Sequence, residues 1–502
     1  DYNRCDVRLE SLTYSGENLT MGEGEQRVAI IGGGISGMAA AERLAALDDA
    51  LEVHLFEASD RLGGVLQTEQ ADGFCLELGP DSMLSRLPWG VELCRRIGLE
   101  QELVSTNSSP SGVYVVCRGR LQRVPAGLAI MAPQRAWPMV TTPILSWPGK
   151  LRLAAECVIP RRRSEQDESL ADFSRRRLGR ETLERLVQPL AGGIYMGDPE
   201  LLSIQATFPQ FVEMEREHGS LIRAARAARA KGGGKQETGG PQYSLFVAPR
   251  RGMAQLVDAL AERLTGCCFH YRQRVESILP DEGGGWRVEV VDGLTRNRWQ
   301  KNFAGVILAL PACHAGPLLM PVNRELATLL GDIPYAGCVV VNLAYERGVV
   351  SHPLDSFGFL APHIERRSIL ACTFSSLKYP GRAPTGKVLL RAFLGGACFP
   401  EVLEWSDEQV LHSVQQELRE LLGVSGPPLF TRIKRWQRSM PQYHVGHLER
   451  VRRIEELAGT MSGLELAGNY CRGVGIPHCI RSGAEASERL VAAMHRNVQL
   501  QH

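Results

Sequence analysis

One glycine motif constrains the fold of this chain more than any other feature. The run Gly32-Gly33-Gly34-Ile35-Ser36-Gly37 matches G-x-G-x-x-G and lies between a buried-strand pattern at 27–31 and a helical pattern at 35–47. A second apolar run, at 51–56, then ends at Glu57. Strand, helix and acid in this order are typical of the β-α-β unit that binds a dinucleotide.

The residues of this motif have separate physical roles. Gly32 permits a tight turn, Gly34 lets the backbone approach a pyrophosphate, and Gly37 lets the helix pack closely on the strand. The first helical turn, at 35–36, offers free N–H groups and a partial positive charge to the phosphates. Glu57 is placed to accept hydrogen bonds from a ribose, and its charge favours a free 2′-hydroxyl over a 2′-phosphate.

Length and composition exclude several classes of protein. With 502 residues, 44% hydrophobic and 23% charged, the chain is predicted to form two or three globular domains. The net charge of +1 gives no reason to expect nucleic acid as the main partner. The 13 cysteines are scattered without a CxxC pair, which predicts reduced thiols and no metal site. The chain contains no run of about 18 apolar residues, so no membrane-spanning helix is predicted.

The patterns change character along the chain. We expect residues 1–24 to be a disordered N-terminal extension, with the native chain beginning at Met21. The predicted fold is an α/β protein with a discontinuous dinucleotide-binding Rossmann-type domain into which other domains are inserted. The predicted parts are the Rossmann-type domain at 25–86, 245–310 and 464–502, a helical domain at 87–212, a linker or loop at 213–244, and a mixed-sheet substrate domain at 311–463.

A second motif indicates which dinucleotide is bound. The segment Arg61-Leu62-Gly63-Gly64-Val65-Leu66-Gln67-Thr68 resembles the R-x-G-G-x-x-x-T element of the flavin amine oxidase superfamily, which includes amine oxidases, carotenoid desaturases and porphyrinogen oxidases. Arg61 can contact a pyrophosphate with two hydrogen bonds. The resemblance implies FAD as the cofactor, and the absence of cysteine around Trp436 implies that it is bound non-covalently.

Further segments match this superfamily. Residues 77–82 are similar to a stretch that lies against the flavin, residues 466–483 resemble the second FAD motif, and Val275 corresponds to a valine whose backbone pairs with adenine. An ordinary buried strand residue is the alternative for Val275, and Trp436 is expected to cover the flavin. The cofactor-binding residues so implied are Gly32, Gly33, Gly34, Ile35, Ser36, Gly37, Glu57, Arg61, Gly63, Gly64, Val65, Gly79, Pro80, Asp81, Ser82, Val275, Trp436, Gly468, Asn469, Val474, Gly475 and Ile476.

Other segments narrow the resemblance to the protoporphyrinogen and coproporphyrinogen oxidases. The similar segments are 188–203, 206–209, 357–360, 441–447 and 471–479. The resemblance implies an oxidation of protoporphyrinogen IX to protoporphyrin IX in haem biosynthesis, in three two-electron steps, with O₂ as acceptor and H₂O₂ as product. In this family a glycine carbonyl aligned with Gly193 faces the pyrroles, so Gly193 is the catalytic and substrate-binding candidate. Leu360, Phe374 and Tyr379 are candidates to sandwich the macrocycle.

Several alternatives stay open. Coproporphyrinogen III is the alternative substrate, because the family's propionate-binding arginine corresponds here to Val113, with Arg118, Arg120 and Arg123 as possible substitutes. An amine oxidase and a flavoprotein without turnover are alternative functions, although 475–479 lacks the aromatic residue of several amine oxidases.

We expect a cytoplasmic protein that binds the membrane peripherally through 87–212, where apolar stretches accompany arginines. Besides the porphyrinogen and O₂, candidate partners are a second copy of the chain, forming a homodimer, and a chelatase that receives the product.

Overall fold

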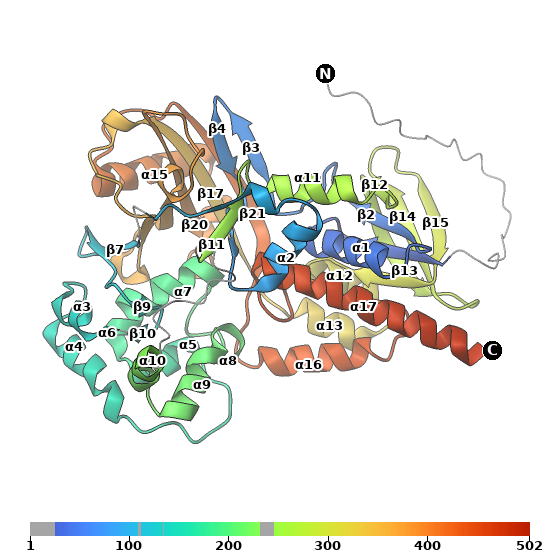
Figure 1. Cartoon of the computed structure of the whole chain (residues 1–502), viewed down its shortest axis with the longest axis horizontal. Helices are drawn as coiled ribbons and strands as arrows, with labels where there is room; N and C mark the ends of the chain where they lie inside the picture. The colour runs from blue at the N-terminus through green and yellow to red at the C-terminus, as the bar shows by residue number, and fades with distance from the viewer. Residues whose placement is uncertain (1–25, 109–111, 134, 231–244, 502) are drawn as a thin grey trace.

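The computed structural model describes residues 26–108, 112–133, 135–230 and 245–501 (Figure 1). The expected extension at 1–24 lies outside the described residues. Within them, no helix combines the length and the apolarity needed to cross a bilayer.

A parallel five-stranded sheet forms the centre of the dinucleotide-binding domain. Its strand order, β12-β2-β1-β16-β22, has the glycine-rich turn leaving the central strand β1. All four neighbouring pairs are parallel, which agrees with the predicted Rossmann-type arrangement. The strands are β1 (Arg27–Ile31), β2 (Glu52–Glu57), β12 (Cys268–Tyr271), β16 (Gly305–Leu308) and β22 (Leu464–Leu466).

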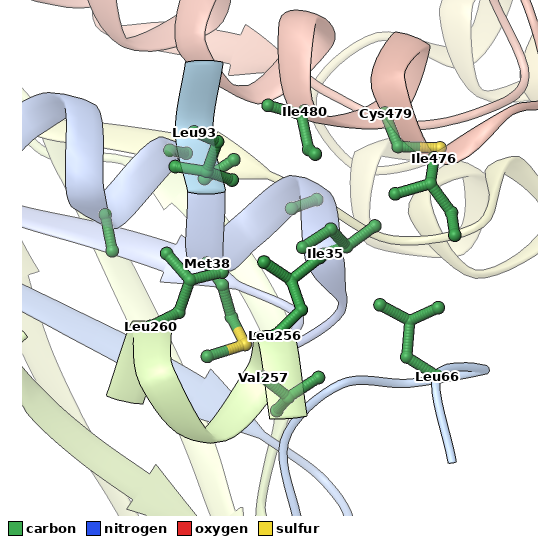
Figure 2. Close-up of a cluster of buried hydrophobic side chains, with 14 of the residues drawn as sticks. Ile35, Met38, Leu66, Leu93, Leu256, Val257, Leu260, Ile476, Cys479 and Ile480 are labelled. Carbon is green, nitrogen blue, oxygen red and sulfur yellow. The ribbon is translucent and has the colours of Figure 1, made fainter. Parts of the chain in front are cut away.

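Helices cover one face of this sheet. Alternate residues of β1 and β2, such as Val28 and Leu55, share one apolar core with these helices. Figure 2 shows Ile35, Val257 and Ile476, from three of these helices, converging in it. Helices α1 and α17 cross so closely that a Cβ on Gly483 would overlap the Ser36 carbonyl oxygen. The covering helices are α1 (Ile35–Leu47), α2 (Pro88–Arg96), α11 (Ala254–Arg263) and α17 (Ile476–Gln501).

The other face of the sheet packs on a second apolar core. Ala29 and Phe56 point into this core, together with residues of an antiparallel three-stranded sheet. The elements around it are β13 (Gln273–Pro280), β14 (Trp286–Asp292), β15 (Arg298–Phe303), α12 (Ala312–Leu319), α13 (Arg324–Gly331) and α16 (His447–Ala458).

A mixed seven-stranded sheet forms the substrate domain, in the order β21-β17-β20-β19-β18-β7-β8. Helix α15 (Asp407–Leu422) covers one of its faces through Val410, Val414 and Leu418. The strands are β7 (Tyr114–Cys117), β8 (Arg120–Arg123), β17 (Tyr335–Glu346), β18 (Gly358–Leu360), β19 (Ile369–Phe374), β20 (Lys387–Gly395) and β21 (Phe430–Pro441). Short β3 (Thr68–Ala71) and β4 (Phe74–Glu77) form a hairpin, and β5 (Met83–Leu84), β11 (Phe246–Pro249) and β6 (Leu103–Ser105) form a small sheet.

A group of short helices packs around a core of its own, at the end of the molecule away from the C-terminal part of α17 (Figure 1). These helices are α3 (Ala136–Thr141), α4 (Trp147–Ala154), α5 (Leu170–Arg177), α6 (Arg180–Thr182), α7 (Gln188–Tyr195), α8 (Ile204–Thr207), α9 (Pro209–His218) and α10 (Leu221–Ala230).

The structure confirms the predicted fold class and corrects several boundaries. Within the expected substrate domain at 311–463, the helices α12, α13 and α16 pack on the second core of the dinucleotide-binding sheet. Residues 213–230 lie in α9 and α10 rather than in a linker, since Pro209 starts α9 and Gly219, with φ +66°, ends it. The rest of the expected linker, 231–244, lies outside the described residues. At the start of the expected helical domain, Leu93 and Leu103 pack into the dinucleotide-binding core, and 114–123 joins the substrate sheet.

Candidate functional site

The glycines of the first turn differ in their surroundings. Gly32 has φ +111° and a Cβ there would lie 2.5 Å from the Ala309 carbonyl oxygen, while a Cβ on Gly37 would overlap the Gly32 carbonyl oxygen. Gly34 has an ordinary φ of −71°, and a Cβ there would meet nothing within 4 Å. Packing therefore requires Gly32 and Gly37, whereas Gly34 borders open space at the start of α1, where no side chain caps the helix. This arrangement fits a bound pyrophosphate.

Glu57 closes the adjacent edge of the site. One of its carboxylate oxygens accepts a 2.9 Å hydrogen bond from the Gly33 amide, and the other accepts one of 2.8 Å from the Ser59 amide. The Arg272 amide donates to the Ser59 carbonyl oxygen, also at 2.8 Å. Arg272 directly precedes β13, which contains the buried Val275. The structure thus brings Val275's strand to the Glu57 side of the site. A ribose at Glu57 and adenine at Val275 remain predictions.

The Arg61–Thr68 loop lies against the glycine turn. The Gly63 amide donates to the Gly33 carbonyl oxygen at 2.8 Å, and a Cβ on Gly64 would lie 3.4 Å from Gly34 Cα. The Arg61 guanidinium donates to carbonyl oxygens of its own loop, at 2.5 Å for Gly64 and 3.1 Å for Leu62. The contact between Arg61 and a pyrophosphate remains a prediction.

Residues 77–82 continue the site toward the substrate domain. A Cβ on Gly79 would overlap the carbonyl oxygen of Val65, so only glycine lets this segment lie on the Arg61–Thr68 loop. The indole N–H of Trp436 donates to the Leu78 carbonyl oxygen at 2.7 Å. Trp436 therefore lies beside the segment expected to contact the flavin. Pro80, Asp81 and Ser82 follow in the same turn.

The C-terminal motif closes the site beside the glycine turn. The Gly468 amide donates to Ser482 Oγ at 3.0 Å, and the Tyr443 hydroxyl donates to the Asn469 carbonyl oxygen. Gly475 precedes the start of α17, where Ile476 packs into the same core as Ile35 (Figure 2). The first and last FAD segments of the sequence thus come together in space.

Two predicted substrate residues lie in contact range. Gly193 is exposed on α7, and a Cβ there would lie 3.3 Å from Leu360 Cδ2. Leu360 and Val474 both pack against the helical-domain core. Gly193 and Leu360 are therefore close neighbours, and Leu360 packs on the same core as Val474 of the C-terminal FAD motif.

The prediction that Phe374 contacts the macrocycle is corrected by strand alternation. Phe374 is fully buried in the core under α15, together with Phe359, at a ring-centroid distance of 6.3 Å. Side chains alternate along a strand, so the neighbouring Thr373 shares the sheet face of Leu360. Phe393 of β20 is an aromatic residue on that face which the sequence reasoning missed and which the register of β19 with β20 identifies.

Tyr379 does not lie beside Gly193 either. It follows α14 (Ser375–Lys378), is 1% exposed, and belongs to the dinucleotide-binding core. Its ring lies between the cations of Lys378 and Arg382, at 5.4 and 5.6 Å. No open ring face remains for a macrocycle, which corrects the second aromatic prediction.

One group of metal-type donors occurs among the described residues. Ligand atoms of Glu52, His54 and Cys268 lie within 4.8 Å of one another. The Lys301 ammonium lies 3.3 Å from His54 Nε2 and 3.6 Å from the Glu52 carboxylate. A lysine therefore already supplies the cation at this cluster.

Comparison with known proteins agrees with this geometry. The family model described as flavin containing amine oxidoreductase matches residues 35–491. The chain belongs to this family, and within it to the protoporphyrinogen and coproporphyrinogen oxidases. Its cofactor is FAD.

The relatives match over nearly the whole chain. A coproporphyrinogen III oxidase from Bacillus subtilis is 35% identical over 93% of this chain and 98% of its own length. A chloroplastic protoporphyrinogen oxidase from Nicotiana tabacum is 29% identical over 93% and 86%. A solved structure from Exiguobacterium sp. 255-15, provisionally named a protoporphyrinogen oxidase, is 30% identical with a TM-score of 0.81, covering 93% of this chain and 98% of that one.

Proposed function

We propose that this chain oxidises a porphyrinogen to the porphyrin by FAD-dependent, O₂-dependent removal of six electrons, with release of H₂O₂. The observation that carries the proposal is that Gly193 and Leu360 are close neighbours, and that Leu360 packs on the same core as Val474 of the C-terminal FAD motif. FAD, when bound, accepts a hydride and passes the electrons to O₂. The residues of this chain have to orient the macrocycle and keep water away from it.

The substrate we propose is coproporphyrinogen III, in place of the protoporphyrinogen IX expected from the motifs. The supporting observation is similarity, since the bacterial relative named coproporphyrinogen III oxidase is 35% identical and the plant protoporphyrinogen oxidase 29%. Among the arginines considered for propionates, Arg123 is already paired with Asp355 at 2.6 Å. This leaves the exposed Arg118 and Arg120 as candidates for propionate binding.

The proposed reaction needs geometry more than an acid or base. Loss of a hydride from a meso carbon leaves a cation delocalised over the pyrroles, so no strong base is required at that carbon. The imidazole within the C-terminal motif, that of His478, packs against Gly473 and lies 5.9 Å from the Trp89 ring. Burial, together with Arg481 and Arg86, lowers its pKa and keeps it neutral at pH 7. We expect His478→Ala, His444→Ala and Glu213→Ala each to retain measurable turnover.

The test is a direct comparison of substrates. The purified holoprotein is mixed anaerobically with coproporphyrinogen III or protoporphyrinogen IX, flavin bleaching is recorded, and air is then admitted while porphyrin fluorescence is followed. We expect faster bleaching with coproporphyrinogen III. Faster bleaching with protoporphyrinogen IX would reverse the choice of substrate, and bleaching by an amine alone would favour an amine oxidase. A flavin that no substrate bleaches would indicate a flavoprotein without turnover.

We also propose that the protein is cytoplasmic and binds a membrane peripherally. We further propose that it forms a homodimer and passes the porphyrin to a chelatase. The membrane proposal is supported by large apolar side chains exposed on α3 and α4, among them Trp137 at 75% and Trp147 at 67%.

A further inference from the structure

A buried arginine lies at the centre of the substrate sheet. Arg391 of β20 is 3% exposed and neighbours Asn342 of β17 and Thr373 of β19. It points to the sheet face opposite the core under α15, the same face as Leu360. A buried guanidinium is costly unless it is paired and hydrogen-bonded, so its partners indicate its role.

The partners of Arg391 belong to the segment 77–82, which is predicted to face the cofactor. Its guanidinium donates to the Gly79 carbonyl oxygen and lies 3.4 Å from an Asp81 carboxylate oxygen. Lys378 Nζ donates to both Asp81 oxygens at 3.0 Å. Although burial alone would raise the pKa of Asp81, Lys378 and Arg391 hold that pKa well below its usual range. The carboxylate is therefore charged, and it joins two cations of the substrate domain to the turn after Gly79.

This turn is adjacent to the dinucleotide site. Gly79 lies directly on Val65, and Val65 follows the Gly63 amide that is bonded to Gly33. Two buried polar atoms of the sheet, Arg391 Nε and Asn342 Oδ1, have no hydrogen-bond partner among the described residues. A donor and an acceptor on neighbouring strands are thus left for a ligand on this face.

The charges around the turn do not cancel. Lys378 and Arg391 lie 3.0 and 3.4 Å from the Asp81 carboxylate, and Arg382 lies 3.6 Å from the Glu77 carboxylate, so three largely buried cations accompany two carboxylates. Burial raises the pKa of Glu77, while the nearby Arg382 opposes that rise. Charges in a buried group act over several ångströms because water screens them poorly. An excess of positive charge therefore lies beside the FAD site.

We propose that Arg391 is a positioning residue that holds the Gly79–Asp81 turn against FAD and, through its excess positive charge, raises the reduction potential of the bound flavin. The hydrogen bonds of Arg391 hold the turn in place, and its positive charge stabilises the negative charge of the reduced flavin. This inference rests on FAD binding and not on the porphyrinogen substrate.

The test measures the flavin midpoint potential of the holoprotein without any porphyrinogen, so its outcome is independent of the substrate proposal. Arg391→Met should shift the potential to a more negative value and weaken FAD binding. Asp81→Asn removes the opposing charge and should shift the potential in the positive direction. A role confined to holding the turn would loosen it in both variants and could not produce opposite shifts.

Matched controls complete the test. Arg435→Met removes an arginine of β21 that pairs with Asp407 and lies on the opposite sheet face, next to Val339, and it should leave the potential unchanged. Arg391→Lys keeps the charge, so its flavin midpoint potential should stay close to that of the wild type. The proposal is overturned if Arg391→Met leaves the potential unchanged, or if Arg391→Met and Asp81→Asn shift it in the same direction. If Arg391→Met cannot hold FAD, an unchanged or more negative potential in Asp81→Asn overturns the proposal alone.

Discussion

At the scale of single residues, the glycines of the first turn separate folding from binding. Gly37 is required by packing, because any side chain there would overlap the Gly32 carbonyl oxygen. Gly34 has an ordinary φ and open space around its missing Cβ, so the fold itself does not require glycine there. The need for glycine at position 34 then comes from what binds beside it.

We predict that Gly34→Val folds but loses FAD. The branched side chain would occupy the place of the pyrophosphate, and FAD affinity should fall by at least about tenfold, or roughly 1.4 kcal/mol. Flavin absorbance per protein measures the loss, and thermal unfolding of the apoproteins shows whether the fold survives. Gly37→Val is the contrasting variant and should give little soluble protein. Normal flavin content in Gly34→Val would show that the pyrophosphate does not lie at Gly34.

A second residue-scale prediction concerns Gly193. A Cβ there would lie 3.3 Å from Leu360 Cδ2, so Gly193→Leu places a side chain on the surface where the macrocycle is proposed to bind. Hydride transfer depends on placing the reacting atoms about 3–3.5 Å apart, and the displaced substrate should react roughly 100-fold more slowly. Single-turnover flavin reduction measures this rate. FAD content should stay normal, because Gly193 belongs to α7 and not to the dinucleotide turn; wild-type reduction rates would contradict the assignment.

At the scale of elements, the sequence predicted those that local patterns define. The turn between β1 and α1 was predictable because its glycine spacing, preceding strand and following acid all lie within one short segment. Phe374 was misassigned because a shift of one residue turns a strand side chain to the other face, and the face that is buried depends on α15, which lies outside the β19 segment. Arg391 had no sequence signal, since its partners Gly79 and Asp81 are far away in the chain.

Helix α16 allows a prediction about acid stability. It begins at His447, which is 2% exposed, stacks on Tyr443 at 4.1 Å, and has Nε2 3.1 Å from the Cys471 carbonyl oxygen. Burial lowers the pKa of His447 from 6.5 to about 4. The unfolded chain therefore takes up a proton that the folded protein does not, and stability is full above pH 6.5 and falls as the pH drops toward 4.

We expect this histidine to contribute about 2 kcal/mol to the loss of unfolding free energy between about pH 7.5 and pH 5. Urea unfolding at both pH values measures the loss in the wild type and in His447→Gln, whose amide can still donate to the Cys471 carbonyl oxygen. The variant should lose less stability on acidification. His495→Gln, at a side chain that is 62% exposed, is the control. Equal acid losses in the wild type and His447→Gln would show that His447 is not the group responsible.

At the scale of the whole molecule, three parts of the protein contribute residues to the predicted FAD and substrate site. The dinucleotide-binding domain supplies the glycine turns, the substrate sheet supplies Trp436 and Arg391, and the helical domain supplies Gly193. The helical domain also carries a surface that the reaction does not use. This surface lies on α3, α4 and the turn that follows, away from the C-terminal part of α17 (Figure 1).

We predict that this surface binds anionic membranes. It exposes Trp137, Trp147, Leu151 and Val158 by 67 to 78%, and Lys150 lies 4.6 Å from the Trp147 ring centroid. Exposed apolar side chains gain free energy at a lipid interface, and each nearby cation adds about 1 kcal/mol with anionic lipid. Trp147→Ser/Leu151→Ser should reduce co-flotation with anionic liposomes several-fold at low salt and leave thermal stability unchanged, since both side chains face solvent. Leu294→Ser, at a side chain 69% exposed in the dinucleotide-binding domain, should float like the wild type. Wild-type protein that stays wholly at the bottom of the gradient would exclude membrane binding by this surface.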